Sequence, residues 1–242
     1  MTERSLDARA LKAVVFDIDG TLYRQGALRR AMLVRLLTAH LVRPLTGWRT
    51  LTALQAYRRA QEQLRHDAQS GGAEAQLALA CERSRMDRAA VAACVERWME
   101  REPLAILQRF VQPGLIEFLD ACRARGLRLA TLSDYPGDDK LQALGIAQYF
   151  DVRLCAQAPE IGVFKPNPRG LHVAMERLGT TARETLYVGD RVDVDAAAAE
   201  AAAVPAAIIV SARSPGPVRH LEATSYSELR ERLFGRSQPS VP

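Results

Sequence analysis

The sequence is poor in cysteine and histidine. Its four cysteines include no CxxC pair and no spacing typical of metal ligands, which argues against a disulfide scaffold or a zinc cluster. The four histidines form no cluster along the chain, and we assign them no role. The chain has 242 residues, of which 48% are hydrophobic, so it can build a sizeable core without such support. Cysteine usage of this kind is typical of the reducing cytoplasm.

Long hydrophobic runs are also absent. No stretch reaches the roughly 18–20 apolar residues of a membrane-spanning helix. The first residues, Met1–Lys12, are polar and charged and contain no signal-peptide pattern. The last residues, Gly235–Pro242, are small and polar, and we expect them to be frayed. These features together predict a cytoplasmic protein that does not span a membrane.

Acidic residues are scarce in one part of the chain. From Arg24 to Arg65 there are nine arginines and one acid, Glu62, although the whole chain carries a net charge of only +5. Either these arginines form solvated helix faces, or they attract an anionic substrate or an anionic surface. No zinc-finger or RNP-type motif accompanies them, so we do not expect a nucleic-acid partner.

One stretch of this basic part, Ala27–Val42, mixes Leu, Val and Met with Arg29, Arg30 and Arg35. Such a mixture is typical of a helix that lies in a membrane interface. The same pattern fits a helix that buries its apolar side against neighbouring helices, which is the interpretation we favour. Contact with a membrane surface is the alternative.

Strand and helix signals alternate along two separated parts of the chain. Apolar runs predict strands at 13–16, 127–132, 152–155, 185–188 and 206–210. Helical spacing predicts helices at 115–125, 138–144, 169–178 and 195–203. Because these strands are apolar almost throughout, we predict an α/β fold whose parallel sheet is covered on both faces.

The block from about Tyr23 to Val111 differs from the rest. It is rich in Ala, Leu and Arg, and its apolar residues recur at helical spacing. Pro44 and the turn Ser70-Gly71-Gly72 divide it into separate helices. The sequence therefore predicts an all-helical module inserted after the first strand.

Polar side chains stand at the ends of predicted strands or in the loops that follow them. They are Asp17 and Asp19, Ser133, Lys165, and Asp190 with Asp193 and Asp195. The carboxyl ends of parallel strands share one edge, where ligands bind. Asp17 and Asp19 are two residues apart, so both can face one pocket, and a divalent cation such as Mg²⁺ would relieve their repulsion. Taken one at a time, these residues also have structural explanations. Asp19 could form a turn, Ser133 or Asp190 could cap a helix, and Lys165 could be a surface lysine.

In this order, the motifs resemble those of the haloacid dehalogenase (HAD) superfamily of phosphohydrolases. The matching residues are DIDGT at 17–21, Ser133, the pair Lys165-Pro166, and GDRVDVD at 189–195. The resemblance implies a Rossmann-like parallel sheet core, the HAD fold, formed by 1–22 and 112–242. It also implies that 23–111 is an inserted all-α cap domain of the C1 type.

The resemblance also implies a role for each matching residue. Asp17 would be the nucleophile that forms an aspartyl-phosphate, and Asp19 the general acid and base. Mg²⁺ would be held by the Asp17 side chain, the Asp19 backbone carbonyl and Asp190. The residues implied to bind the substrate phosphate are Ser133, Asp134, Lys165, Gly20 and Thr21. The family places a further acid four or five residues after Asp190, and because residue 194 is valine we expect Asp195, with Asp193 as the alternative, to support the metal site.

Two features narrow the choice within the superfamily. The resemblance implies that dehalogenases of this superfamily do not need an acid two residues after the nucleophile, so Asp19 disfavours dehalogenation. No lysine lies between Lys12 and Lys140, which removes the cap lysine that a phosphonate-cleaving member would need. We predict a phosphatase for a small phosphate ester, such as a sugar phosphate or phosphoglycolate. A β-phosphoglucomutase-type phosphomutase and a non-catalytic HAD-scaffold binding protein stay open, as do a monomer and a homodimer.

Overall fold

The structure is a computed structural model that describes residues 8–66 and 72–235. The expected turn at Ser70-Gly71, most of the polar N-terminus and nearly all of the tail lie outside the described residues. No helix in the described part of the chain is both long and apolar enough to cross a membrane.

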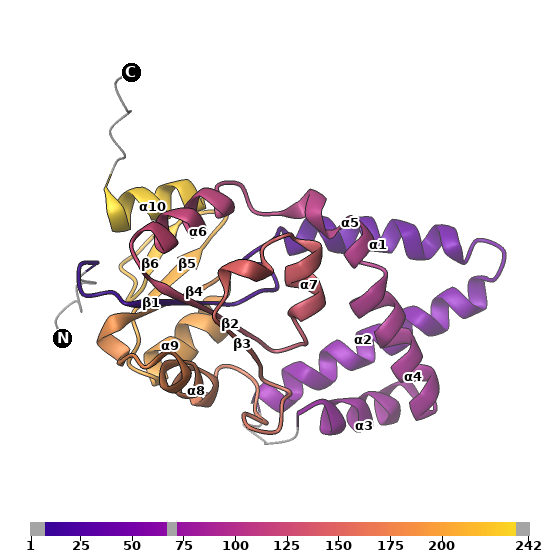
Figure 1. The fold of residues 1–242 in the computed structure, drawn as a ribbon. Helices are drawn as coiled ribbons and strands as arrows, with labels where there is room; N and C mark the ends of the chain where they lie inside the picture. The colour runs from indigo at the N-terminus through magenta and orange to yellow at the C-terminus, as the bar shows by residue number, and fades with distance from the viewer. Residues whose placement is uncertain (1–7, 67–71, 236–242) are drawn as a thin grey trace.

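The centre of the molecule is a six-stranded parallel sheet with the order β3-β2-β1-β4-β5-β6 (Figure 1). Its strands are β1 Ala13–Phe16, β2 Arg128–Ser133, β3 Val152–Cys155, β4 Thr185–Gly189, β5 Ala206–Ile209 and β6 Leu221–Ala223. The first five confirm the predicted strands to within a residue at each end. The edge strand β6 was not predicted, because three residues with a central Glu222 carry no strand pattern.

Helices cover both faces of the sheet, which explains the nearly continuous apolar strands (Figure 1). Alternate residues of β1 point to opposite sides: Phe16 packs in the cluster beneath α6 and α10, and Val15 in the cluster beneath α8 and α9. The helices of this part are α6 Leu115–Ala124, α7 Asp138–Ala143, α8 Arg169–Leu178, α9 Ala197–Ala201 and α10 Tyr226–Phe234. Short helical turns are η2 Gln108–Phe110, η3 Ala147–Tyr149, η4 Ala182–Glu184 and η5 Val192–Ala196.

The segment 23–111, between β1 and α6, is helical, as predicted, and lies beyond one end of the sheet (Figure 1). Its helices are α1 Gln25–Ala39, α2 Pro44–His66, α3 Gly72–Ser84, α4 Arg88–Val95, η1 Glu96–Arg101 and α5 Leu104–Leu107. Pro44 opens α2, where a missing N–H costs nothing. The buried faces of α2, α3 and α4 pack together, whereas α1 buries only Leu28, Met32 and Leu36.

The two connections of this helical segment to the sheet run side by side. Tyr23 and Val111 form an antiparallel bridge. The backbone N–H of Arg24 donates to Phe110 at 2.8 Å, and that of Gln112 donates to Leu22 at 3.0 Å. The chain therefore leaves and re-enters the sheet-containing part at one place.

Phe118 offers a test of the packing above the sheet. Its buried ring lies 6.0 Å from Phe16, 5.3 Å from Tyr226 and 5.9 Å from Phe234, centroid to centroid. We expect Phe118→Ala to lower the free energy of unfolding by about 3–5 kcal/mol, measured by urea denaturation. Ile116→Ala, on the half-exposed side of the same helix, should cost about 0.5 kcal/mol. Equal losses would contradict this packing.

Candidate active site

The buried ammonium group of Lys165 connects three of the motifs predicted from the sequence. Lys165 Nζ lies 2.6 Å from Asp17 Oδ1, 2.7 Å from Asp195 Oδ1 and 3.0 Å from the hydroxyl of Tyr187. All four side chains are almost fully buried. Burial alone would lower the pKa of Lys165, but the carboxylates of Asp17 and Asp195 outweigh it and hold this pKa well above its usual value. Lys165 is therefore a fixed charge inside the protein, not a surface lysine.

Asp17 stands where β1 ends, and its backbone N–H donates to Val188 O of β4 at 2.9 Å. Its second carboxylate oxygen accepts a hydrogen bond of 2.9 Å from the Thr21 hydroxyl. Burial raises the pKa of Asp17 well above its usual value, and although Lys165 lowers it, Asp195 and Asp190 raise it again. The carboxylate is thus held in place but remains short of compensating positive charge.

Asp190 lies beside Asp17 at the end of β4. Together with Asp195, these residues each offer an oxygen within 4.8 Å of the other two. Burial, reinforced by the charge of Asp195, raises the pKa of Asp190 to about 6. Three crowded carboxylates with one ammonium group are what a divalent cation would stabilise, and carboxylate oxygens are the ligands that Mg²⁺ prefers. The residues present therefore fit a Mg²⁺ ion.

The structure places Asp195 and Asp193 differently. One carboxylate oxygen of Asp195 faces Lys165, and the other accepts hydrogen bonds from the backbone N–H groups of Asp190 and Arg191 at 3.1 and 3.0 Å. Asp195 therefore fixes the loop that carries Asp190. Asp193 points away from this cluster and pairs with Arg191 on the surface.

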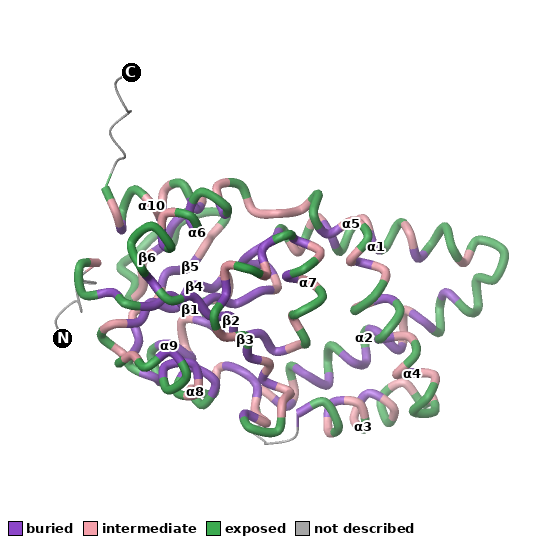
Figure 2. Tube along the Cα trace, in the orientation of Figure 1, coloured by how far each residue is buried: buried purple, intermediate pink, exposed green. Residues whose placement is uncertain are grey.

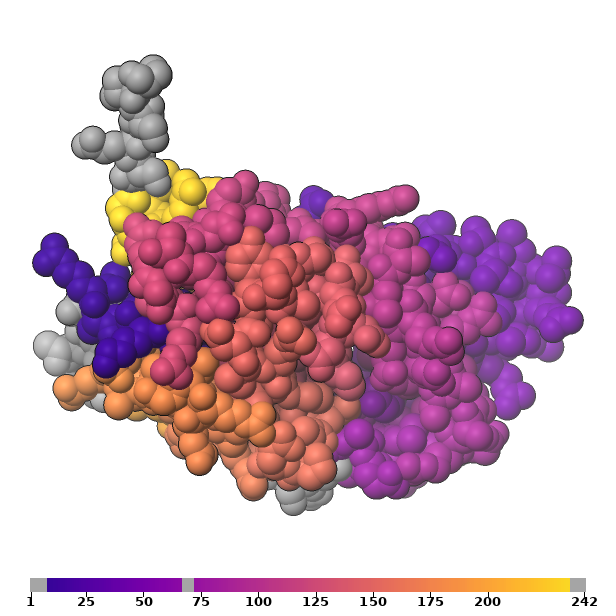
Figure 3. All heavy atoms as spheres, in the orientation of Figure 1, coloured from indigo at the N-terminus to yellow at the C-terminus, as the bar shows by residue number. Residues whose placement is uncertain are grey.

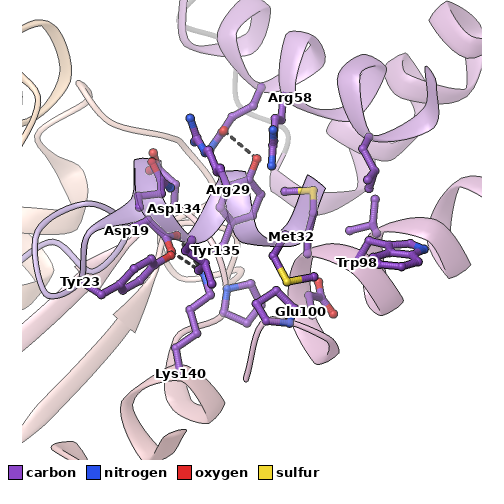
Figure 4. A pocket seen from close by; sticks show the side chains of 18 of the residues that line it. Asp19, Tyr23, Arg29, Met32, Arg58, Trp98, Glu100, Asp134, Tyr135 and Lys140 are labelled. Atoms are coloured by element: carbon purple, nitrogen blue, oxygen red, sulfur yellow. Dashed lines mark hydrogen bonds and ion pairs between the residues drawn. The ribbon is translucent and has the colours of Figure 1, made fainter. Parts of the chain in front are cut away.

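Asp19 belongs to a second polar group. Both of its carboxylate oxygens accept hydrogen bonds from Lys140 Nζ, at 2.7 and 2.9 Å, and the Tyr23 hydroxyl donates to one of them (Figure 4). Burial raises the pKa of Asp19, but Lys140 and Tyr23 outweigh it, so the pKa lies below its usual value. Asp19 faces the cavity instead of closing the local turn.

The remaining predicted residues lie at different positions around the cluster of Asp17, Lys165, Asp190 and Asp195. Gly20 has a φ of +108°, and a Cβ there would overlap the carboxylate of Asp190. Ser133 is buried at the end of β2, where its hydroxyl accepts a 3.3 Å hydrogen bond from the backbone of Tyr135. The carboxylate of Asp134 accepts hydrogen bonds from Arg65 of α2 and from the backbone N–H of Lys165, the latter at 3.2 Å.

A cavity of about 690 Å³ lies between the end of the sheet and the helical segment (Figure 4). Its sheet side includes Asp17, Asp19, Lys165 and Asp190. Its far side is mostly apolar and includes Met32, Leu36, Leu54, Trp98 and Leu107. Of the residues predicted to bind the substrate phosphate, Asp134 and Lys165 line the cavity, whereas Gly20, Thr21 and Ser133 do not.

Sequence reasoning missed Lys140, Tyr23, Arg65 and Tyr187. Lys140 and Arg65 reach the centre from helices, and helical charge patterns do not show which residue faces a cavity. Tyr187 lies within an apolar strand, where the pattern indicates only core. No pattern along the sequence distinguishes these four residues from their neighbours.

Comparison with known proteins agrees with this geometry. A family model for haloacid dehalogenase-like hydrolases matches residues 11–203. The chain belongs to this family. It is 31% identical over 192 residues to the glyceraldehyde 3-phosphate phosphatase of Methanopyrus kandleri, covering 76% of this chain and 78% of that protein. It is 30% identical over 185 residues to the N-acetylmuramic acid 6-phosphate phosphatase of Pseudomonas aeruginosa, covering 74% of each.

Solved structures in the family have the same fold. The crystal structure of a HAD phosphatase from Thermococcus onnurineus superposes with a TM-score of 0.66 and 25% identity, covering 93% of this chain and 99% of that one. The chain is thus a HAD-type hydrolase, and the two relatives named above are phosphatases.

Gly20 provides a test of the close approach between the loop after β1 and Asp190. We expect Gly20→Ala to lower the free energy of unfolding by about 1–3 kcal/mol, because alanine is strained at this φ and its Cβ displaces Asp190. Gly26→Ala, in α1 with nothing within 4 Å of the new Cβ, should raise it by about 0.4–1 kcal/mol. Thermal and urea unfolding measure both, and a neutral Gly20→Ala would contradict the contact.

Proposed function

We propose that the protein is a Mg²⁺-dependent phosphomonoester hydrolase that acts through an aspartyl-phosphate on a small phosphorylated metabolite in the cytoplasm. The observation that carries this proposal is the Asp17–Lys165–Asp195 contact beside Asp190, at the edge of the cavity. Further support comes from the phosphatases among the family relatives.

Asp17 performs the first step of the proposed reaction. One of its carboxylate oxygens forms a bond to phosphorus while the bond from phosphorus to the ester oxygen breaks. Lys165 and Thr21 hold the attacking carboxylate in a fixed orientation. A bound Mg²⁺ ion, held by Asp17, Asp190 and the carbonyl of Asp19, would neutralise the phosphoryl charge.

Asp19 carries the proton. It protonates the departing alkoxide in the first step and takes a proton from the attacking water in the second. The ionised form favoured by Lys140 suits the second step, and Asp19 must take up a proton before the ester bond breaks in the first. The side chains of Ser133 and Lys165 would bind the phosphate oxygens. The backbone N–H groups of Gly20, Thr21 and Asp134 would donate further hydrogen bonds to them. The Asp134 carboxylate itself would repel phosphate and is already bound to Arg65.

The helical segment acts as the cap in this proposal, with 23–111 as its bounds. The paired connections at Tyr23 and Val111 support those bounds. The cap would close the cavity over the substrate and limit access of water. A phosphomutase would share these groups, and a non-catalytic protein on this scaffold would be expected to have lost at least one of them.

Asp17 gives the direct test of activity. We expect purified protein to release phosphate from p-nitrophenyl phosphate only with Mg²⁺, and Asp17→Asn to lower kcat at least about a thousandfold. Asp193→Asn, the same change at the exposed acid, should alter kcat by less than about threefold. Full activity in Asp17→Asn would contradict the proposal.

Arg29 and Arg58 suggest that the substrate carries a second negative charge. Both line the cavity, and no carboxylate of the described residues pairs with either (Figure 4). Partial burial, together with the neighbouring charge of Arg29, lowers the pKa of Arg58. An anionic group of the substrate placed between them would relieve this repulsion.

We expect Arg58→Ala to raise KM for phosphoglycolate about tenfold or more and KM for p-nitrophenyl phosphate by less than about threefold. Arg59→Ala is the matched control, since Arg59 is the next residue of the same helix and does not line the cavity. Steady-state kinetics with both substrates measure the difference. Equal changes in KM for both would show that Arg58 does not distinguish the second charge.

A further inference from the structure

Exposed apolar side chains gather at one place on the molecule. Of the ten large hydrophobic residues exposed in the described chain, seven lie between Leu33 and Trp48, around the turn that joins α1 to α2. We call this group the apolar tip; its members are Leu33, Val34, Leu37, Leu41, Val42, Leu45 and Trp48. The apolar side of the segment 27–42 is thus buried only in part, unlike the buried helix that the sequence led us to favour.

The apolar tip stands at the end of the molecule farthest from the sheet. The α1–α2 turn projects at the right of Figure 1, the same turn is exposed in Figure 2, and it forms the outer edge of the surface in Figure 3. Trp48 is 71% exposed, Leu45 81% and Val42 88%. Nothing in the described chain covers these side chains.

The backbone of the α1–α2 turn is fixed by hydrogen bonds and by close packing, which keeps the side chains of the apolar tip exposed. The backbone N–H of Arg43 donates to His40 O at 2.9 Å, and that of Gly47 donates to Arg43 O at 3.2 Å. A Cβ at Gly47 would come within 2.9 Å of the His40 Cβ, so the backbone of α2 passes directly against His40. The ring of His40 in turn lies 5.8 Å from that of Trp98.

The charged side chains of α1, of the turn and of α2 as far as Gln61 have one sign, although Glu102, just after η1, pairs with Arg35. No acidic residue occurs from Gly20 to Gln61. Arg30, Arg43 and Arg49 are exposed, and none forms an ion pair with a described residue. Apolar side chains among unpaired arginines match a surface that offers hydrocarbon below a layer of negative charge.

We propose that the apolar tip docks the protein on an anionic lipid surface. Val42, Leu45 and Trp48 enter the boundary between headgroups and acyl chains, while Arg43 and Arg49 bind lipid phosphates. A second copy of this chain fits less well, because it would bring the same arginines against each other. A nucleic acid would gain nothing from the exposed leucines and valines. The proposal does not depend on the catalytic activity.

Vesicle co-sedimentation tests the docking. We expect the full-length protein to bind phosphatidylcholine vesicles containing phosphatidylglycerol at least about tenfold more tightly than phosphatidylcholine alone, and less tightly as salt rises. The double variant Val42→Asp/Leu45→Asp should lower binding about tenfold or more. Val218→Asp, at an exposed apolar residue outside the apolar tip, should bind as the wild type does. Equal binding to both vesicle types, or no loss in the double variant, would overturn the proposal.

Trp48 supplies a readout of insertion. The chain has two tryptophans, so Trp98→Phe leaves Trp48 as the one emitter. Its emission should shift to shorter wavelength with anionic vesicles and stay unchanged with neutral ones. Circular dichroism checks that the variant is folded. An unchanged spectrum would overturn the proposal. So would a lipid-free dimer that Val42→Asp/Leu45→Asp dissociates, since the apolar tip would then be an interface between two copies.

Discussion

The contact on which the structure depends is the buried Lys165 ammonium between Asp17 and Asp195. An ammonium group without partners would be costly to bury, and so would either carboxylate. Together they join the end of β1 to the loop after β4 and fix Asp17 beside Asp190. One lysine cannot balance all of these acids. The negative charge that remains on Asp17, Asp190 and Asp195 favours a divalent cation beside them. The same contacts that stabilise the edge of the sheet therefore also form the proposed metal site.

The cavity is lined by two parts of the chain, the edge of the sheet and the helical segment 23–111. Groups from the sheet edge surround the place proposed for the phosphate, and groups from the helices line the rest of the cavity. Arg65 crosses between these parts to reach Asp134, and Gln61 accepts a 2.7 Å hydrogen bond from Tyr135. Polar contacts of this kind set the position of the helical segment over the sheet.

Much of the fold was predictable because it depends on local patterns. Apolar runs that end in Asp17, Ser133 and Asp190 identify strands covered on both faces, and the helical spacing of 23–111 identifies its helices. The three-residue β6 has no such pattern. Lys140 reaches Asp19 only through tertiary packing, which no spacing along the chain encodes. The exposure of Leu41 and Val42 could not be predicted either, because the sequence pattern of an apolar helix face is the same whether or not another element packs against it.

The central claim is that Asp17 receives the phosphoryl group, and chemical trapping of that intermediate tests it most directly. The enzyme is mixed with Mg²⁺ and a phosphate ester that it hydrolyses, quenched in acid during turnover, digested, and examined by mass spectrometry. We predict one phosphoryl group on the peptide that contains Asp17, and none on the same peptide of Asp17→Asn. Turnover with no phosphorylated peptide under conditions that preserve acyl phosphates, or with the phosphoryl group on another residue, would contradict it.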